Sequence, residues 1–226
     1  MATPSWAEIF TTIFTTTGKS SREYDAVVVG AGPAGSSAAR ALAKAGARVL
    51  LLERRPQIGL PVQCAEYVPR LITLHAPLEP CHIAQEVEEM ETFLPSGEVV
   101  RNRFPGYILN RSLFDKSLAI AASQCGAELL VGAEAIDLTP GGLVVECKHP
   151  TRSRFEVHAK VIIGADGPVS TIGRLTGRVN AKFVAAAQCE VALKEPLKST
   201  RVYFDPAYVG GYGWAFPKGA TANWRH

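Results

Sequence analysis

The residues best suited to chemistry are three glycines and a carboxylate near the amino terminus. Gly30, Gly32 and Gly35 form a G-x-G-x-x-G pattern, and Glu53 follows eighteen residues later. In such a pattern the first glycine permits a tight turn, the second lets a pyrophosphate approach bare backbone, and the third lets a helix pack closely on a sheet. A carboxylate at Glu53 can accept hydrogen bonds from ribose hydroxyls. The pattern therefore predicts a dinucleotide site, without separating FAD from NAD.

A second candidate position lies at Asp166 and Gly167. The apolar run 160–164 is typical of a buried strand, and the residues A-D-G-P follow it directly. A carboxylate at the carboxyl end of a parallel strand faces the ligand crevice. Asp166 equally suits the N-cap of a short helix over 170–175, so the residues alone leave both interpretations open.

The elements that would position these residues start with a βαβ unit over 24–54, comprising a strand at 26–29, a helix from Pro33 and a strand at 48–53. The pattern then predicts a hairpin over 85–104 turned at 95–97, a short strand at 107–109 and a helix over 111–125. The apolar positions of that helix are Leu113, Phe114, Leu118 and Ala121 or Ala122. The remaining predicted strands are 128–131, 134–138, 143–147, 154–158 and 160–164, with longer antiparallel strands at 182–192 and 200–205.

Composition narrows the class of protein. The chain has 226 residues, 47% hydrophobic and 20% charged, which is ordinary for a globular protein. A net charge of +3 without a basic run gives no reason to expect nucleic acid. Five cysteines without a C-x-x-C pair, and histidines at no ligand spacing, favour a reducing compartment and no metal site. No apolar stretch reaches the roughly 18 residues that span a bilayer, and we expect residues 1–23 to be a poorly ordered leader.

Several ordered motifs carry a family resemblance. They are GAGPAG at 30–35, Glu53-Arg54, a C-A-E segment at 64–66, Arg111 with Asp115, and GADG at 164–167. Together they resemble the flavoproteins related to p-hydroxybenzoate hydroxylase. Within that group the chain is most similar to the geranylgeranyl reductase family, through GLPVQCAEYVP at 59–69, NRSLFD at 110–115 and YGWAFP at 212–217. The last stretch matches the core of the family's P-x-x-Y-x-W-x-F-P signature.

The resemblance implies that the cofactor is FAD. Its adenosine would lie at Glu53 and its pyrophosphate over the glycine loop, and Arg111 would meet the phosphates or the ribityl chain because a guanidinium is a rigid donor fork. Asp166 and Gly167 would help to hold FAD and shape the approach of a reductant. The full set of implied cofactor-binding residues is Gly30, Gly32, Ala34, Gly35, Glu53, Arg54, Ala65, Arg111, Ala135, Asp166 and Gly167.

The resemblance also implies an activity. Reduced flavin would pass a hydride to an isoprenoid double bond, with NAD(P)H or ferredoxin as the electron donor. The alternating Tyr212, Trp214 and Phe216 would share one face of a strand, either as a wall for a polyprenyl chain or as an ordinary core. Cys64 would lie near the isoalloxazine or be an inert buried thiol. Glu66 beside it is a candidate proton donor.

The implied fold is α/β, with an FAD/NAD(P)-binding Rossmann-like three-layer domain and an antiparallel β substrate domain. We expect the FAD-binding domain at 24–180, with a substrate-side insertion at about 66–106, and the start of the substrate sheet at 181–226. We expect a cytoplasmic protein with at most peripheral membrane contact. The sequence carries no signal for an oligomeric state.

The chain departs from the family pattern at three places. Val209 stands where the signature has proline, and Tyr67 stands where many relatives carry glycine, which would narrow the flavin-side pocket. The sequence also stops before the family's G-D motif, so we expect a truncated copy whose aromatic strand leaves an unpaired edge. The alternatives to a reductase are a flavin monooxygenase of the same fold and a non-catalytic remnant.

Overall fold

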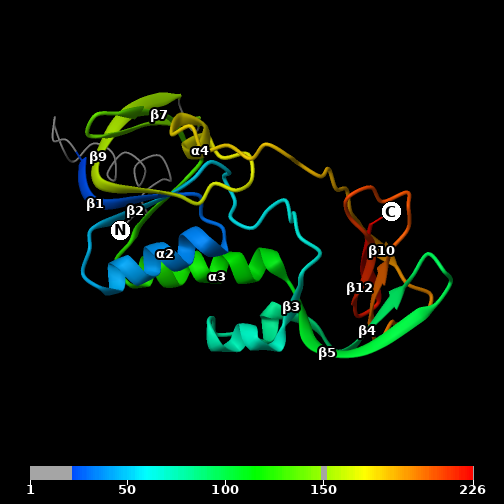
Figure 1. Cartoon of the computed structure of the whole chain (residues 1–226). Helices are drawn as coiled ribbons and strands as arrows, with labels where there is room; N and C mark the ends of the chain where they lie inside the picture. The colour runs from blue at the N-terminus through cyan, green and yellow to red at the C-terminus, as the bar shows by residue number, and fades with distance from the viewer. Residues whose placement is uncertain (1–21, 149–151, 226) are drawn as a thin grey trace.

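The computed structural model describes residues 22–148 and 152–225, which form two β-sheets joined by extended segments and flanked by helices (Figure 1). Nearly all of the predicted leader, residues 1–21 of 1–23, lies outside the described residues. Within the described part of the chain, no helix is long and apolar enough to cross a membrane.

The first sheet contains the predicted βαβ unit. Its strand order is β6-β2-β1-β9-β8-β7, with β1 (Arg22–Val29), β2 (Val49–Glu53), β6 (Glu128–Val131), β7 (Ala133–Thr139), β8 (Gly142–Cys147) and β9 (Ser153–Gly164). Strands β6, β2, β1 and the second half of β9 pair in parallel, whereas β7, β8 and the first half of β9 pair antiparallel. Helix α2 (Pro33–Lys44) connects β1 to β2.

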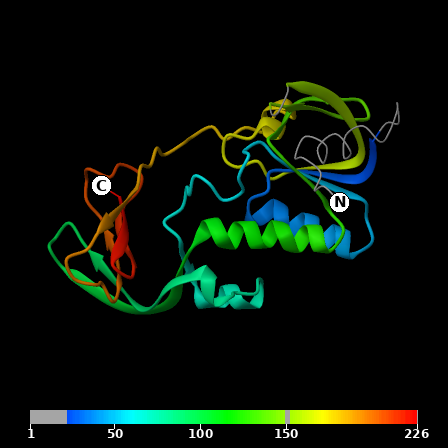
Figure 2. The same ribbon diagram turned by 180° about the vertical axis from the view of Figure 1, so that it is seen from behind.

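Two apolar cores make this domain three layers deep. Helices α2 and α3 (Arg111–Gln124) lie side by side under one face of the parallel strands (Figures 1 and 2). Small residues such as Ala39 and Ala122 pack there against Val28 of β1. On the other face the curled antiparallel strands and the short helix α4 (Thr171–Leu175) cover Val27 and Leu50. The predicted three-layer Rossmann-like architecture is therefore confirmed.

The second sheet draws its strands from two distant parts of the chain. Its order is β10-β13-β12-β11-β4-β5-β3, with β3 (Tyr67–Pro69), β4 (Ile83–Phe93), β5 (Val99–Leu109), β10 (Cys189–Ala192), β11 (Thr200–Tyr203), β12 (Gly213–Lys218) and β13 (Thr221–Arg225). Two 3₁₀ helices, η1 (Arg70–Leu74) and η2 (Pro80–His82), link β3 to β4. The sheet joins the 66–106 region to the carboxyl-terminal strands.

Several local predictions were wrong in extent. The strands expected at 154–158 and 160–164 are one strand, β9, and the strand expected at 107–109 is the end of β5. The strand expected over 182–192 is confined to β10, and β11 pairs in parallel with β4. Leu113, expected in the apolar stripe of α3, is 47% exposed, whereas Phe114, Leu118 and Ala122 are buried. Strand β12 lies between β11 and β13, so it is no unpaired edge.

Candidate functional site

A cleft opens at the carboxyl ends of β1, β2 and β9, where the sequence predicted a ligand crevice. It comprises two adjoining cavities of about 300 and 370 Å³, which we call the Asp166 cavity and the Cys64 cavity after a residue that lines each. Cavities of this size suit small ligands. The two cavities share six lining residues: Gly32, Glu53, Arg55, Gln63, Ala165 and Gly167. They therefore form one continuous site.

The three glycines of the loop differ in their surroundings, and those of Gly30 and Gly35 suit the turn and the close helix packing that their spacing predicts. Gly30 has a φ of +102°, and a Cβ added there would meet the Ala165 carbonyl oxygen at 2.4 Å. A Cβ added at Gly35 would lie 1.8 Å from the Gly30 carbonyl oxygen, so only glycine lets α2 pack against the loop. At Gly32 an added Cβ would meet nothing within 4 Å. Gly32 therefore leaves bare backbone facing the cleft.

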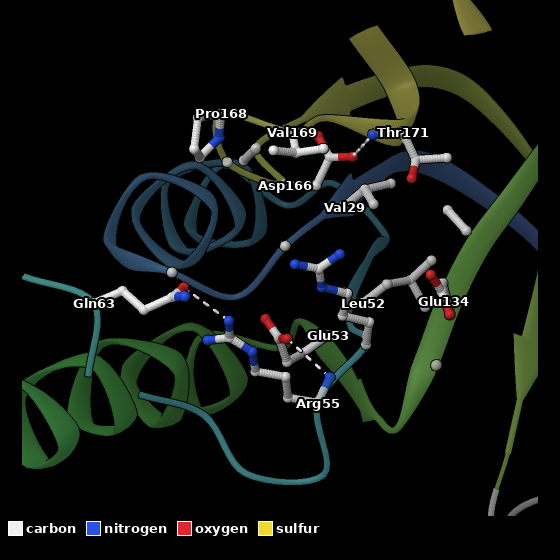
Figure 3. A pocket seen from close by; sticks show the side chains of 17 residues that line it. Val29, Leu52, Glu53, Arg55, Gln63, Glu134, Asp166, Pro168, Val169 and Thr171 are labelled. Carbon is white, nitrogen blue, oxygen red and sulfur yellow. Dashed lines mark hydrogen bonds between the residues drawn. The ribbon is translucent and has the colours of Figure 1, made fainter. Parts of the chain in front are cut away.

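Glu53 reaches the glycine loop from the end of β2. Its two carboxylate oxygens accept hydrogen bonds from the backbone N–H groups of Ala31 at 3.0 Å and Arg55 at 2.9 Å. A carboxylate has about four lone-pair positions, so acceptor capacity remains for a ligand. Arg55 in turn donates to the Gln63 side chain at 2.8 Å, and this chain of contacts forms one wall of the cleft (Figure 3).

Asp166 occupies the facing wall, and its carboxylate caps α4. It accepts from the Ser170 hydroxyl at 2.5 Å and from the backbone N–H groups of Thr171 and Ile172 at 2.6 and 3.2 Å (Figure 3). Ser170 is the N-cap proper. The two interpretations left open by the sequence are thus compatible, because the capping carboxylate also lines the Asp166 cavity. Gly167, with a φ of +86°, turns the chain beside it.

The remaining predicted cofactor residues divide between the two cavities. Arg54 and Ala135 line the Asp166 cavity, and Ala34 lines the Cys64 cavity. Ala65 lines neither and packs instead against the core of the second sheet. The structure thus brings together predicted residues that lie more than one hundred positions apart in the chain.

Arg111 lies in the Cys64 cavity at the first position of α3. Its Nε and a terminal guanidinium nitrogen donate to the two carboxylate oxygens of Asp115 at 2.8 and 3.0 Å. Burial alone lowers the pKa of Arg111, but the Asp115 carboxylate and the Cys64 sulfur together raise it by more, so the net pKa lies above its ordinary value. The guanidinium is therefore a fixed positive charge in the cleft.

Within the C-A-E segment, Cys64 lines the cleft and Glu66 does not. Cys64 lines the cavity named after it, and its sulfur accepts from the Glu66 backbone N–H at 3.3 Å. Glu66 is only 2% exposed and lines neither cavity. Its carboxylate lies 2.7 Å from the Lys218 ammonium, on the side of the second sheet. These surroundings do not support the predicted proton-donor role for Glu66.

The aromatic signature divides into a buried and an exposed part. Trp214 and Phe216 are 8% and 5% exposed and pack with Val87 in the core of the second sheet. Tyr212 precedes β12 and is 41% exposed, with its ring 6.0 Å from that of Trp214. None of the three lines either described cavity. In this structure Tyr212 is thus the member of the signature that presents an accessible ring.

Tyr67 also belongs to the second sheet. Its hydroxyl donates to the Phe104 carbonyl at 3.1 Å, and its ring lies 5.8 Å from that of Phe216. Gly106 makes room for the ring, since a Cβ there would approach it at 2.5 Å. Burial raises the pKa of the Tyr67 hydroxyl. Tyr67 lines neither cavity, so it does not narrow the cleft as expected.

Sequence reasoning missed three residues that the two cavities share. Arg55 and Gln63 form the bridge on one wall, and Ala165 meets the glycine loop. Arg55 adjoins the recognised Glu53-Arg54 pair, and Ala165 lies inside the GADG motif, so position next to a motif was the available signal. Gln63 is brought in by an irregular loop, for which local sequence gives no orientation.

Comparisons with known proteins agree with this geometry. A model of the NAD(P)-binding Rossmann-like domain matches residues 28–77. A digeranylgeranylglycerophospholipid reductase of Methanopyrus kandleri is 42% identical over 87% of this chain and 55% of its own length. The crystal structure of a geranylgeranyl bacteriochlorophyll reductase-like protein from Thermoplasma acidophilum covers 91% of this chain and 56% of its own, with a TM-score of 0.80 and 32% identity.

A more distant likeness concerns the fold alone. The myxobacterial chondrochloren halogenase, described as an FAD-dependent halogenase, covers 90% of this chain and 52% of its own, with a TM-score of 0.70 and 20% identity. The chain spans about half the length of the curated relatives it matches. Over the region that it shares with them, the chain belongs to the geranylgeranyl reductase family, within the FAD-dependent oxidoreductase fold.

Proposed function

We propose that this chain is the FAD-binding part of a reductase that saturates isoprenoid double bonds. The observation that carries the proposal is the continuous cleft, in which a glycine loop suited to a pyrophosphate shares its walls with a cavity lined by Cys64 and Arg111. A dinucleotide laid across both cavities would have its nucleoside end near Asp166 and its reactive end near Cys64.

The residues present fit FAD. The bare backbone at Gly32 admits a pyrophosphate, and the amino terminus of α2 offers N–H groups and a positive dipole end. Glu53 retains acceptor capacity for ribose hydroxyls, and Arg111 is a fixed cation for phosphate oxygens. Arg54 and the backbone near Ala135 would flank the adenosine.

The chemistry would divide between cofactor and chain. A bound FAD, once reduced, supplies the hydride that an isoprenoid double bond accepts. Glu53, Gly32 and Arg111 would bind and orient the cofactor, and the Cys64 loop would border its reactive end. Ala65 would contact the cofactor only through a shift of that loop. We propose NAD(P)H or a ferredoxin as the electron donor.

The substrate class follows from the relatives, which are named for digeranylgeranylglycerophospholipid. We propose a polyprenyl lipid, with Tyr212 as its first contact on the second sheet and Trp214 and Phe216 supporting that ring. Peripheral contact with a membrane would follow from such a substrate. A domain division at about residue 180 would place cofactor binding before it and substrate contact after it. Helix α4, the last element that packs on the first sheet, ends just before this position.

The test is turnover of a defined lipid. The FAD-loaded chain, chemically reduced under anaerobic conditions, is incubated with digeranylgeranylglycerophospholipid, and the lipid is analysed by mass spectrometry. Gain of two hydrogens per saturated double bond supports the proposal. FAD binding with an unchanged lipid would contradict it for this chain. Oxygen uptake that depends on a phenol and NAD(P)H would instead favour a monooxygenase.

A further inference from the structure

Glu66 is a buried carboxylate that the proposed chemistry does not use. It is 2% exposed and has a φ of +71°, the only positive φ of a non-glycine residue in the described part of the chain. A left-handed conformation is strained for a residue with a side chain, and strain of this kind persists only where the surrounding contacts fix it. The contacts around Glu66 show what fixes it.

One oxygen of the Glu66 carboxylate is held by the second sheet. Its Oε2 accepts from the Lys218 ammonium at 2.7 Å and from the Asn223 side-chain amide at 2.6 Å. Lys218 ends β12 and Asn223 lies in β13, so both donors come from strands more than 150 residues further along the chain. A buried charge of this kind requires such partners.

The other oxygen and the backbone N–H of Glu66 are bound to Arg111 and Cys64, which line the cleft. Oε1 accepts from the backbone N–H of Arg111 at 3.0 Å, at the start of α3. The Glu66 N–H donates to the Cys64 sulfur at 3.3 Å, and the Glu66 carbonyl accepts from Leu109 at 2.9 Å. The carboxylate therefore lies between the second sheet and the two residues, Cys64 and Arg111, that line the Cys64 cavity.

The same part of the chain also holds the backbone of the C-A-E segment. Gln188, just before β10, donates to the Cys64 carbonyl at 2.9 Å, and Asn223 donates to the Ala65 carbonyl at 3.3 Å. Three side chains from the carboxyl-terminal quarter of the chain thus bind three consecutive residues of the loop. The position of the loop depends on contacts that its own sequence does not contain.

We propose that Glu66 is a positioning residue through which the second sheet holds Cys64 and Arg111 in their places in the cleft. The placement of Cys64 follows from these contacts alone, and only its consequence for FAD rests on the proposed function. Removing Lys218 leaves a buried charge without its main partner, which costs more than the net value of the bond. The C-A-E segment then shifts until the Glu66 carboxylate is exposed to solvent, and Cys64 and the start of α3 shift with it.

The test measures the reactivity of Cys64 in the full chain without cofactor or lipid. In a Cys81→Ser/Cys189→Ser background, which removes the two exposed thiols, maleimide modification of Cys64 is followed by peptide mass mapping. Lys218→Met should raise the rate about tenfold or more, the factor equivalent to about 1.4 kcal/mol. FAD affinity, measured separately, should fall with it.

Two further variants separate positioning from general loosening. Glu190→Gln removes the other carboxylate near Lys218, 3.6 Å away and half exposed, and should leave the Cys64 rate unchanged. Glu66→Gln/Lys218→Met removes both charges and should bring the rate back toward the wild-type value, because no uncompensated charge is buried. If Lys218→Met fails to fold by circular dichroism, Asn223→Ser serves as the perturbing variant.

The outcomes are distinguishable from those for the proposed function. An unchanged Cys64 rate in a folded Lys218→Met or Asn223→Ser chain overturns the positioning role, whether or not FAD binds. An equal rise in Glu190→Gln also overturns it, since that change leaves Glu66 paired. A rate that rises as expected in a chain that never takes up FAD supports the positioning role and counts against the proposed function.

Discussion

Replacing Gly32 with alanine should separate cofactor binding from folding. The backbone at Gly32 has φ −72° and ψ −178°, a conformation open to alanine, and an added Cβ meets nothing within 4 Å. The stability change should stay within about 1 kcal/mol, because glycine-to-alanine at a compatible position gains about 0.4–1 kcal/mol and the N-cap preference for glycine opposes it. The methyl group would stand where a pyrophosphate approaches, so we expect FAD affinity to fall about 10- to 100-fold, or about 1.4–2.8 kcal/mol.

The same methyl group at Gly35 should have the opposite effect. There the added Cβ would lie 1.8 Å from the Gly30 carbonyl oxygen, a backbone atom that cannot rotate away. The loop and α2 must separate by more than an ångström, so the cost should reach or exceed the upper end of the 1–3 kcal/mol typical of overpacking. For a chain of this size about 3 kcal/mol lowers the thermal midpoint by roughly 6–12 °C.

The assay pairs thermal unfolding of the apo chain with FAD titration followed by flavin fluorescence. Gly32→Ala should keep the wild-type thermal midpoint and lose affinity, whereas Gly35→Ala should lose the midpoint. An unchanged FAD dissociation constant in Gly32→Ala would refute the assignment of this backbone to the pyrophosphate. Equal thermal losses in both variants would refute the structural distinction between the two glycines.

Three other changes test the remaining parts of the account. Glu53→Ala should weaken FAD about 10- to 100-fold through loss of charge-assisted bonds. Glu128→Gln, at the amino-terminal start of the neighbouring strand β6 and outside both cavities, should leave FAD titrations unchanged; equal effects would remove the ribose role. Trp214→Ala should lower the free energy of unfolding by about 3–5 kcal/mol in chemical denaturation because the ring is buried, and a negligible change would show that the ring is not core. The hydrogen bond from Arg154, with a second arginine beside it, holds the pKa of Glu146 below its ordinary 4.5. The stability that the charged Glu146 carboxylate contributes is complete above pH 4.5 and is lost as pH falls through the lower pKa of the folded state. The difference in thermal midpoint between wild type and Glu146→Gln should therefore shrink from about pH 7 to about pH 3; a constant difference would contradict this.

The glycine loop and its surroundings were predictable because their constraints are local. The turn at Gly30 and the close approach of Gly35 to the Gly30 carbonyl oxygen act over a few residues. The apolar run into β1 and the alanine-rich α2 favour the same βαβ unit. The carboxylate of Glu53 falls at the end of the next strand for the same reason. The cleft at this end of the sheet followed from general rules for parallel strands.

The second sheet was much less predictable because its pairings are not local. β11 lies in parallel beside β4, more than one hundred residues earlier in the chain, and no local pattern specifies that register. β9 continues through Ala159, with its first half beside β8 and its second half beside β1, so the break expected between the strands 154–158 and 160–164 does not exist. Residues 182–188 have strand-like sequence but no strand partner within the described residues, and their apolar side chains Phe183 and Val184 are exposed.

The surroundings of Glu66 depend both on a local motif and on pairings between distant parts of the chain. The C-A-E segment was recognisable as a motif, but the donors that bind its carboxylate, Lys218 and Asn223, come from the last strands of the second sheet. The residue predicted as a proton donor is thus the one for which the contacts support our proposal of a positioning role. A short motif identifies a loop, whereas the role of each side chain in it depends on what packs against it.

The most direct test of the central claim is the visible absorption spectrum of the purified 226-residue chain, with any flavin released by heat and identified. The cleft geometry predicts a yellow protein, or one that becomes yellow on incubation with FAD, carrying FAD in stoichiometric amount. A folded, colourless protein that takes up no added FAD would contradict the account, because the glycine loop, Glu53 and Arg111 would then be in place without forming a cofactor site.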